Sequence, residues 1–321
     1  MTEAPQPGGD ERGGVALTNL DDPLFEGAGA TKRDLVNHLD TVAARILPVL
    51  RDRPLSVIRV HRGQEAFMQK NLPSYAPEWI PRVSTWAESS KREVTYALCN
   101  DRRTLLWFAN QRAIEYHPAL TTVAAPDRVT HLVLDLDPPG GDAFALAVQA
   151  AHLVRRVLAD SSLSGAVKTS AAKGVHVFVP VDDGASIEDA AYATRAIAVR
   201  AERLDPALAT TAFMKEDRGG RVFVDATRVG SATVVAAYSP RLRAGVPVSF
   251  PVAWDDLDRV TPGDFTVHTA ARLLADADPW AAGMPSGQAL PPELVEEGQT
   301  IPGGRVQAMH EGKRRRRAQR E

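Results

Sequence analysis

Two aspartates at the end of an apolar run are the first residues whose types and spacing suggest chemistry. Residues 131–137 read His-Leu-Val-Leu-Asp-Leu-Asp. Side chains alternate along a strand, so Asp135 and Asp137 should share one face. Two carboxylates beside a buried sheet repel each other, and a divalent cation such as Mg²⁺ or Mn²⁺ would relieve the repulsion. The following Asp-Pro-Pro-Gly-Gly-Asp is also good turn sequence, so a strand that simply ends in a turn is the alternative.

A second segment, residues 167–180, predicts a strand, a turn of small residues and another strand. Successive backbone N–H groups in such a turn can bind an anion, and Ser170 and Lys173 would add a hydroxyl and a charge. His176 follows Gly174 by two residues. The alternative is a plain hairpin with one half-buried histidine.

A third segment, residues 221–225, is another alternating strand that ends in an acid, Asp225. A single acid at a strand end is usually a cap or a solvated turn residue. Three acids at strand ends together with a phosphate-type turn fit a two-metal nucleotidyl-transfer site, in which two ions stabilise the attacking and the leaving oxygen.

These segments resemble the three motifs of archaeo-eukaryotic primases, and most closely the polymerase domain of bacterial ligase D and its stand-alone actinobacterial primase-polymerase relatives. The resemblance spans about residues 18–280, and its supporting stretches include residues 67–70, 114–117 and 235–241. It implies an α+β (mixed α/β) fold, a primase-polymerase catalytic core with central mixed sheets flanked by helices.

The resemblance also implies three groups of site residues. Two ions, Mn²⁺ or Mg²⁺, would be held by the catalytic residues Asp135, Asp137 and Asp225. The incoming nucleotide would be bound by Ser170, Lys173, Gly174, His176, Arg241, His117 and Arg59. DNA would be bound by Lys32, Phe67 and Lys70.

Each DNA-binding assignment has an ordinary alternative. Lys32 would grip a 5′-phosphate beside a helix N-terminus, Phe67 would stack on template bases, and Lys70 would contact the backbone. Phe67 could instead pack in the core, and both lysines could be solvated surface charges. His117 could instead be a capping residue before Pro118.

The chain departs from the family pattern at several positions. Met68 stands where close relatives often have a second Phe, which should weaken stacking. Ala171-Ala172 replaces a frequent Gly-Gly, which should stiffen the phosphate turn. Arg228 is followed by Val229 rather than Asn, which should affect the position of the primer 3′ end.

Composition is that of an ordinary globular protein, with 44% apolar and 24% charged residues and a net charge of −2. Six of the positive charges lie in residues 311–320, a predicted phosphate-binding or solubilising tail, so DNA binding by the body needs a local basic face. One cysteine, no hydrophobic signal core and no membrane-length apolar run predict a cytoplasmic, nucleoid-associated protein.

We predict a disordered N-terminus over residues 1–17, a single catalytic domain over 18–290, and a surface-wrapping segment with a basic tail over 291–321. Periodicity predicts helices at 31–50, 104–114, 142–158, 186–204 and 268–276. It predicts strands at 55–60, 94–98, 211–215, 221–225 and 233–237.

The leading functional hypothesis is a DNA-directed nucleotidyltransferase that extends primer 3′ ends to fill short gaps or process double-strand-break ends. By resemblance it would use NTP in preference to dNTP and act on gapped or broken DNA with a 5′-phosphate. The chain carries no ligase module, so a separate DNA ligase and an end-binding protein are the expected partners. The alternatives are a de novo primase and a DNA-end-binding scaffold with little catalysis.

Overall fold

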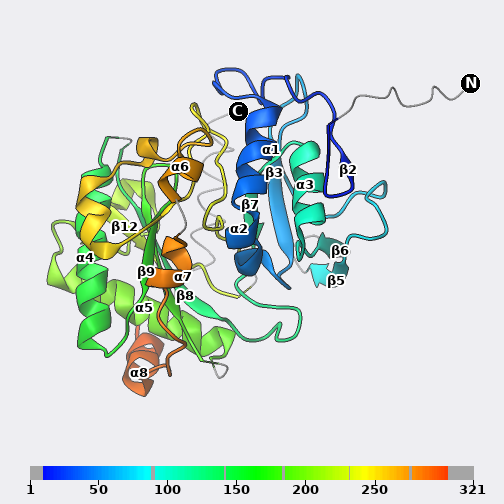
Figure 1. Ribbon diagram of the computed structural model, residues 1–321. Helices are drawn as coiled ribbons and strands as arrows, with labels where there is room; N and C mark the ends of the chain where they lie inside the picture. Colours follow the sequence, from blue (N-terminus) through cyan, green and yellow to red (C-terminus); the bar gives the residue numbers. More distant parts are fainter. Residues whose placement is uncertain are drawn as a thin grey trace, which may run out of the picture.

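In the described residues, the computed structural model contains a six-stranded sheet, a five-stranded sheet and a two-stranded hairpin, with helices packed against the two larger sheets (Figure 1). It describes residues 10–87, 91–140, 142–182, 185–230, 232–274 and 277–302. The larger sheet is antiparallel apart from one parallel pair and the five-stranded sheet is wholly antiparallel, and with the separate helices they confirm the predicted α+β class. None of the helices in the described part of the chain combines the length and apolar composition needed to span a membrane.

The six-stranded sheet carries the predicted catalytic segments. Its strand order is β11-β12-β8-β10-β9-β13, antiparallel except for the β11–β12 pair. In chain order these strands are β8 (His131–Asp137), β9 (Ala166–Thr169), β10 (Val175–Pro180), β11 (Ala209–Thr210), β12 (Val222–Asp225) and β13 (Pro251–Val252).

Two long helices, α4 (Phe144–Asp160) and α5 (Ile187–Leu204), pack against this sheet. Leu132, Leu134 and Leu136 of β8 are buried in the core that the helices form with the sheet. Strand alternation therefore places Asp135 and Asp137 on the opposite face, as the sequence predicts.

The other sheet joins strands from the N-terminal part of the chain. Its order is β4-β3-β6-β5, and β7 also pairs with β3. The strands are β3 (Leu55–Arg59), β4 (Phe67–Gln69), β5 (Arg82–Ala87), β6 (Arg92–Ala97) and β7 (Ala113–Pro118). The neighbouring helices are α1 (Lys32–Thr41), α2 (Ala43–Leu50) and α3 (Arg102–Asn110). Tyr238, Phe250 and Phe265 complete this core from a distant part of the chain.

The helix predicted over 31–50 begins as expected but is interrupted at Val42. Thr31 and Asp34 form a reciprocal capping box, which fixes the start of α1. The helix predicted to reach residue 114 ends at Asn110, because Ala113 to Pro118 join the sheet as the buried strand β7. The strand predicted at 211–215 does not form, because β11 (Ala209–Thr210) ends just before it, and the strand predicted at 233–237 reduces to an isolated bridge at Thr233.

Two described segments near the termini contain regular structure. The hairpin of β1 (Glu11–Arg12) and β2 (Val15–Ala16) lies in the segment predicted to be disordered, and Val15 is buried in the core. The segment predicted to wrap the surface contains α8 (Pro292–Thr300), which packs on α5. The basic residues 311–320 lie outside the described residues.

The remaining elements are short. They are the 3₁₀ turns η1 (Lys215–Asp217), η2 (Trp254–Arg259) and η3 (Pro262–Asp264), and the helices α6 (Ala270–Leu274) and α7 (Pro279–Gly283).

Candidate active site

Four polar side chains form a row across the six-stranded sheet. Asp225 of β12 lies directly opposite Asp135 of β8, Asp135 opposite His176 of β10, and His176 opposite Lys168 of β9. Directly opposed residues project from the same face, so the row collects two acids, an imidazole and an amine. Asp225, His176 and Lys168 are buried, and Asp135 is nearly so.

The contacts of His176 define its proton positions. Lys168 Nζ lies 2.9 Å from His176 Nδ1, and a protonated Lys168 donates to that nitrogen. The ring proton must then sit on Nε2, which faces Asp135 Oδ1 at 3.3 Å. Burial, together with the charge of Lys168, lowers the pKa of His176 to about 4. His176 is therefore a neutral donor at pH 7, a choice that the sequence left open.

Asp135 and Asp225 share a cationic partner, Arg228. Its Nε lies 3.2 Å from Asp225 Oδ2 and its Nη2 3.5 Å from Asp135 Oδ2. The inner oxygen of Asp225 accepts hydrogen bonds from the backbone N–H and hydroxyl of Thr227, at 2.8 and 2.6 Å. Burial alone would raise the pKa of Asp135, but attraction to His176 and Arg228 outweighs it and lowers the pKa to about 2. The Oδ2 oxygen of each carboxylate, called its outer oxygen below, thus faces the guanidinium of Arg228.

The pKa of Asp137 is shifted upward, in the direction opposite to that of Asp135. Burial and the charge of Asp135 raise its pKa, although Lys173 and Arg218 partly offset them. In the described ranges, no three His, Cys, Asp or Glu side chains are arranged to hold one metal ion together. The donors nevertheless fit a divalent cation in kind, because they are hard carboxylate oxygens that already accept a cationic group.

The predicted phosphate turn lies between β9 and β10, next to the row. Ser170 Oγ accepts hydrogen bonds from the N–H groups of Ala172 and Gly174, at 3.3 and 3.1 Å, so these two groups point to the serine. Lys173 Nζ donates to the carbonyl of Pro138 at 2.7 Å. Gly174 allows a close approach of two strands, since a Cβ there would lie 2.2 Å from the carbonyl oxygen of Leu136.

Arg241 and His117 meet at a residue that sequence reasoning missed, Glu115. Glu115 Oε2 lies 3.0 Å from Arg241 Nε and 2.8 Å from His117 Nε2. Arg241 Nη1 also donates to the carbonyl of Ser170 at 3.2 Å, which connects this cluster to the phosphate turn. Burial opposes ionisation of Glu115, but His117 and Arg241 lower its pKa overall. Its position two residues before His117, on the same strand face, was the signal available in the sequence.

Arg59 belongs to the other sheet. Its guanidinium donates to Gln111 O at 2.9 Å, Gln69 Oε1 at 2.6 Å and Tyr75 Oη at 3.0 Å. These bonds tie β3 to β4 and to the residue after α3. The structure therefore does not bring Arg59 into the cluster that holds the predicted nucleotide-binding residues.

The DNA-binding candidates on β4 are exposed. Phe67 is 38% exposed and stacks on His61, with ring centroids 5.2 Å apart. Met68 is more exposed, at 46%, and Lys70 just beyond the strand is also exposed. This finding excludes the core-packing alternative for Phe67.

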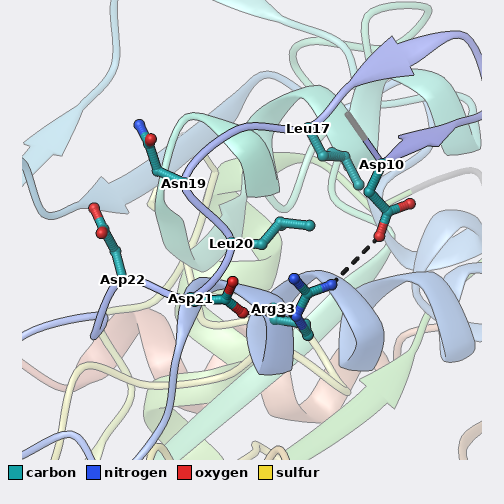
Figure 2. A pocket seen from close by; sticks show the side chains of 7 residues that line it. All are labelled: Asp10, Leu17, Asn19, Leu20, Asp21, Asp22 and Arg33. Atoms are coloured by element: carbon teal, nitrogen blue, oxygen red, sulfur yellow. Dashed lines mark hydrogen bonds and ion pairs between the residues drawn. The ribbon is translucent and has the colours of Figure 1, made fainter. Parts of the chain in front are cut away.

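Lys32 differs from the sequence-based expectation of an exposed charge. Its side chain is buried, and Nζ donates to the carbonyl of Thr18 at 2.5 Å. Burial lowers its pKa to about 8. The adjacent cavity of about 710 Å³ is mostly acidic, with Arg33 as its cation; Figure 2 shows Arg33 reaching toward Asp10. It is lined by Asp10, Leu17, Asn19, Leu20, Asp21, Asp22 and Arg33.

Comparisons with known proteins identify the family of the chain. The family described as "LigD, primase-polymerase domain" matches residues 31–280. The chain is 33% identical over 260 residues to the bifunctional non-homologous end joining protein LigD of Bacillus subtilis, covering 79% of this chain and 41% of that protein. It is 36% identical over 255 residues to the multifunctional non-homologous end joining DNA repair protein LigD of Mycobacterium tuberculosis, covering 76% and 33%. The chain thus matches less than half the length of these relatives.

A solved structure gives the same result. The polymerase domain from Mycobacterium tuberculosis ligase D in complex with DNA superimposes with a TM-score of 0.76 at 33% identity. The match covers 84% of this chain and 99% of that one. The predicted fold and the predicted enzyme class, a nucleotidyltransferase, are confirmed. The chain belongs to the family of LigD primase-polymerase domains.

Proposed function

We propose that this protein is a DNA-directed polymerase that extends primer 3′ ends to fill short gaps or to process double-strand-break ends, with a preference for ribonucleotides. The observation that carries the proposal is the row of Asp225, Asp135 and His176 beside the turn of Ser170. An acidic pair next to phosphate-binding side chains is what nucleotidyl transfer requires.

Asp135, Asp137 and Asp225 are the residues that would hold two Mn²⁺ or Mg²⁺ ions. When bound, such ions stabilise negative charge on the attacking and leaving oxygens. The outer oxygens of Asp135 and Asp225 are the atoms that now face Arg228.

The residues around the turn would bind the triphosphate. The Ser170 hydroxyl retains its own proton to donate, whereas the N–H of His176 would reach a phosphate oxygen by giving up its contact with Asp135. Lys173 and Arg241 supply positive charge from the two sides of the turn, where they now donate to the carbonyls of Pro138 and Ser170. Phosphate oxygens, which carry full charge, are stronger acceptors than those carbonyls.

Binding of DNA is supported by the complex with DNA that the similar polymerase domain forms. In this chain, Phe67 offers an exposed aromatic face for base stacking and Lys70 an adjacent charge. The relatives are named as end-joining proteins, which supports a role in end joining. A separate ligase and an end-binding protein at the nucleoid would be the partners in that role.

Primer extension on a gapped duplex tests the proposal directly. Purified protein with Mn²⁺ should add nucleotides to the 3′ end, and single-turnover rates should be higher with NTP than with matched dNTP. Mn²⁺ should support faster addition than Mg²⁺. An absence of extension under all these conditions would contradict the proposal, and faster dNTP addition would contradict the ribonucleotide preference alone.

A further inference from the structure

Arg228, which is outside the predicted site, contacts two of the predicted metal ligands, Asp135 and Asp225. Asp135 and Asp225 each have one oxygen fixed by the protein, Asp135 Oδ1 by His176 and Asp225 Oδ1 by Thr227. The remaining oxygen of each, Oδ2, faces the same guanidinium. The Oδ2 atoms of Asp135 and Asp225 are the acceptors most suited to a metal ion, and both already contact the Arg228 guanidinium.

We infer that Arg228 is the resident counter-ion of the Asp135–Asp225 pair and that a divalent cation must displace it. This inference rests on the proposed function. Two adjacent carboxylates need positive charge nearby, and a guanidinium supplies it without an ion from solution. A metal ion would use the same Oδ2 atoms, so the two cations compete.

The surroundings of Arg228 favour such an exchange. Its side chain is 40% exposed, whereas that of Asp225 is 7% exposed, so the arginine can swing into solvent while the acids stay in place. Arg228 follows β12 in a segment with no regular structure, three residues beyond Asp225. The contacts, at 3.2 and 3.5 Å, are longer than close charge-assisted hydrogen bonds, so a metal ion bound directly to the same oxygens can replace them.

Competition makes Arg228 a residue that sets metal affinity. Removing the guanidinium should leave Asp135 and Asp225 repelling each other in the metal-free protein. That protein should melt at a lower temperature in EDTA and gain more stability from a metal ion than the wild type does.

Equilibrium titration with Mn²⁺, followed by the electron paramagnetic resonance of free Mn²⁺ without DNA or nucleotide, tests the inference. Arg228→Ala should bind Mn²⁺ about 5- to 10-fold more tightly than the wild type. Arg228→Lys should lie between them, because it keeps the charge but loses the fork that reaches both acids.

Arg218→Ala is the matched control, since it removes the same charge nearby. Arg218 lies over the Phe223 ring at 4.0 Å and donates to the carbonyl of Phe213 at 3.0 Å. Its loss should change Mn²⁺ affinity less than the loss of Arg228. In the wild type, Mg²⁺ should also accelerate solvent exchange of the Arg228 Nε–H, measured by NMR.

The outcomes separate this inference from the proposed function. Equal or weaker Mn²⁺ binding by Arg228→Ala, with measurable binding by the wild type, would overturn the competition and leave the metal assignment standing. An equal gain in Arg218→Ala would overturn it as well, by reducing the effect to net charge. Absence of Mn²⁺ binding in the wild type and every variant would overturn the metal assignment and the competition together.

Discussion

Lys168 Nζ lies 2.9 Å from His176 Nδ1 and 2.6 Å from Ser249 Oγ, in a buried part of the six-stranded sheet. Burial, with the charge of Arg241, lowers the pKa of Lys168 well below its usual value. When protonated, the lysine donates to His176 Nδ1 and so orients the imidazole toward Asp135. Positioning of this kind commonly matters for activity almost as much as the contact groups themselves.

Lys168→Met should change the protonation of the His176 ring while keeping the volume of the buried side chain nearly constant. The methionine keeps the buried stem but cannot donate, so His176 should lose its single tautomer. The ¹⁵N chemical shifts of the imidazole would report this, and nucleotide addition should fall about 10- to 100-fold. Lys173→Met is the control, because Lys173 donates to Pro138 instead. An unchanged tautomer in Lys168→Met would refute the orienting role.

Asp137→Asn should separate stability from activity. The raised pKa of Asp137 means that its ionisation opposes folding, so stability is lost as pH rises through the folded-state pKa. In EDTA at pH 7 the amide should therefore raise the melting temperature by about 1–3 °C, and the gain should shrink below the ordinary carboxyl pKa. Nucleotide addition should fall by about 10²–10³-fold while DNA affinity changes little. Substantial extension by this variant would remove Asp137 from the catalytic group.

Gly174→Ala tests whether Gly174 is needed for the close approach of β8 and β10. Its Cβ would lie 2.2 Å from the carbonyl oxygen of Leu136, so β8 and β10 would have to separate. The expected loss is about 3 kcal/mol in the free energy of unfolding, measured by urea denaturation. Gly140→Ala is the control, because no atom lies within 4 Å of its added Cβ. Equal stability of the two variants would mean that the sheet can yield at this position.

The row of polar residues shows what the sequence could and could not predict. Alternation within residues 131–137 is a local property, so it correctly placed Asp135 on the face away from the leucines. The partnership of His176 with Lys168 depends on register between strands, and Glu115 joins the site from a different sheet. The register between strands and the meeting of the two sheets have no local signal, whereas the spacing of Glu115 and His117 is one.

The buried cations show a second limit. Arg59 and Lys32 were expected to bind nucleotide and DNA, which requires side chains that a ligand can reach. Both are buried in the structure and donate to backbone carbonyls, Arg59 to Gln111 and Lys32 to Thr18. Such acceptors exist only after the chain has folded around the cation.

Lys173→Ala and Arg241→Ala should both raise the KM for nucleotide, but only the second should destabilise the fold. Arg241 neutralises the buried Glu115, so its removal should cost about 3 kcal/mol in the free energy of unfolding. Lys173 donates only to a partly buried carbonyl, and its loss should leave stability nearly unchanged. Steady-state kinetics and thermal melting measure the two effects. Loss of DNA affinity at constant nucleotide KM would show that the two residues bind DNA and that their assignment to nucleotide binding is wrong.

Gapped DNA with a recessed 5′-phosphate should bind more tightly than the same gap with a 5′-hydroxyl, and Lys32→Met should erase the difference. A phosphate at the start of α1 would have to replace the Thr18 carbonyl as the acceptor for Lys32. Because Lys32 is buried with a pKa near 8, the variant should also change stability. The unfolded chain holds this proton more strongly, so the wild type should gain stability relative to Lys32→Met as pH rises from about 8 to 10.5.

Two further variants identify the group that reads the 5′-phosphate. Arg62→Ala removes an exposed cation that lines a cavity of about 850 Å³ beside Thr31. Deletion of residues 312–321 removes most of the basic tail and should lower general affinity and flatten its salt dependence, because fewer counterions are released. Fluorescence anisotropy with paired phosphate and hydroxyl gaps should show the preference intact in both variants. If instead the preference survives Lys32→Met and disappears with Arg62→Ala or with the tail, that other group reads the DNA end and the Lys32 assignment is wrong.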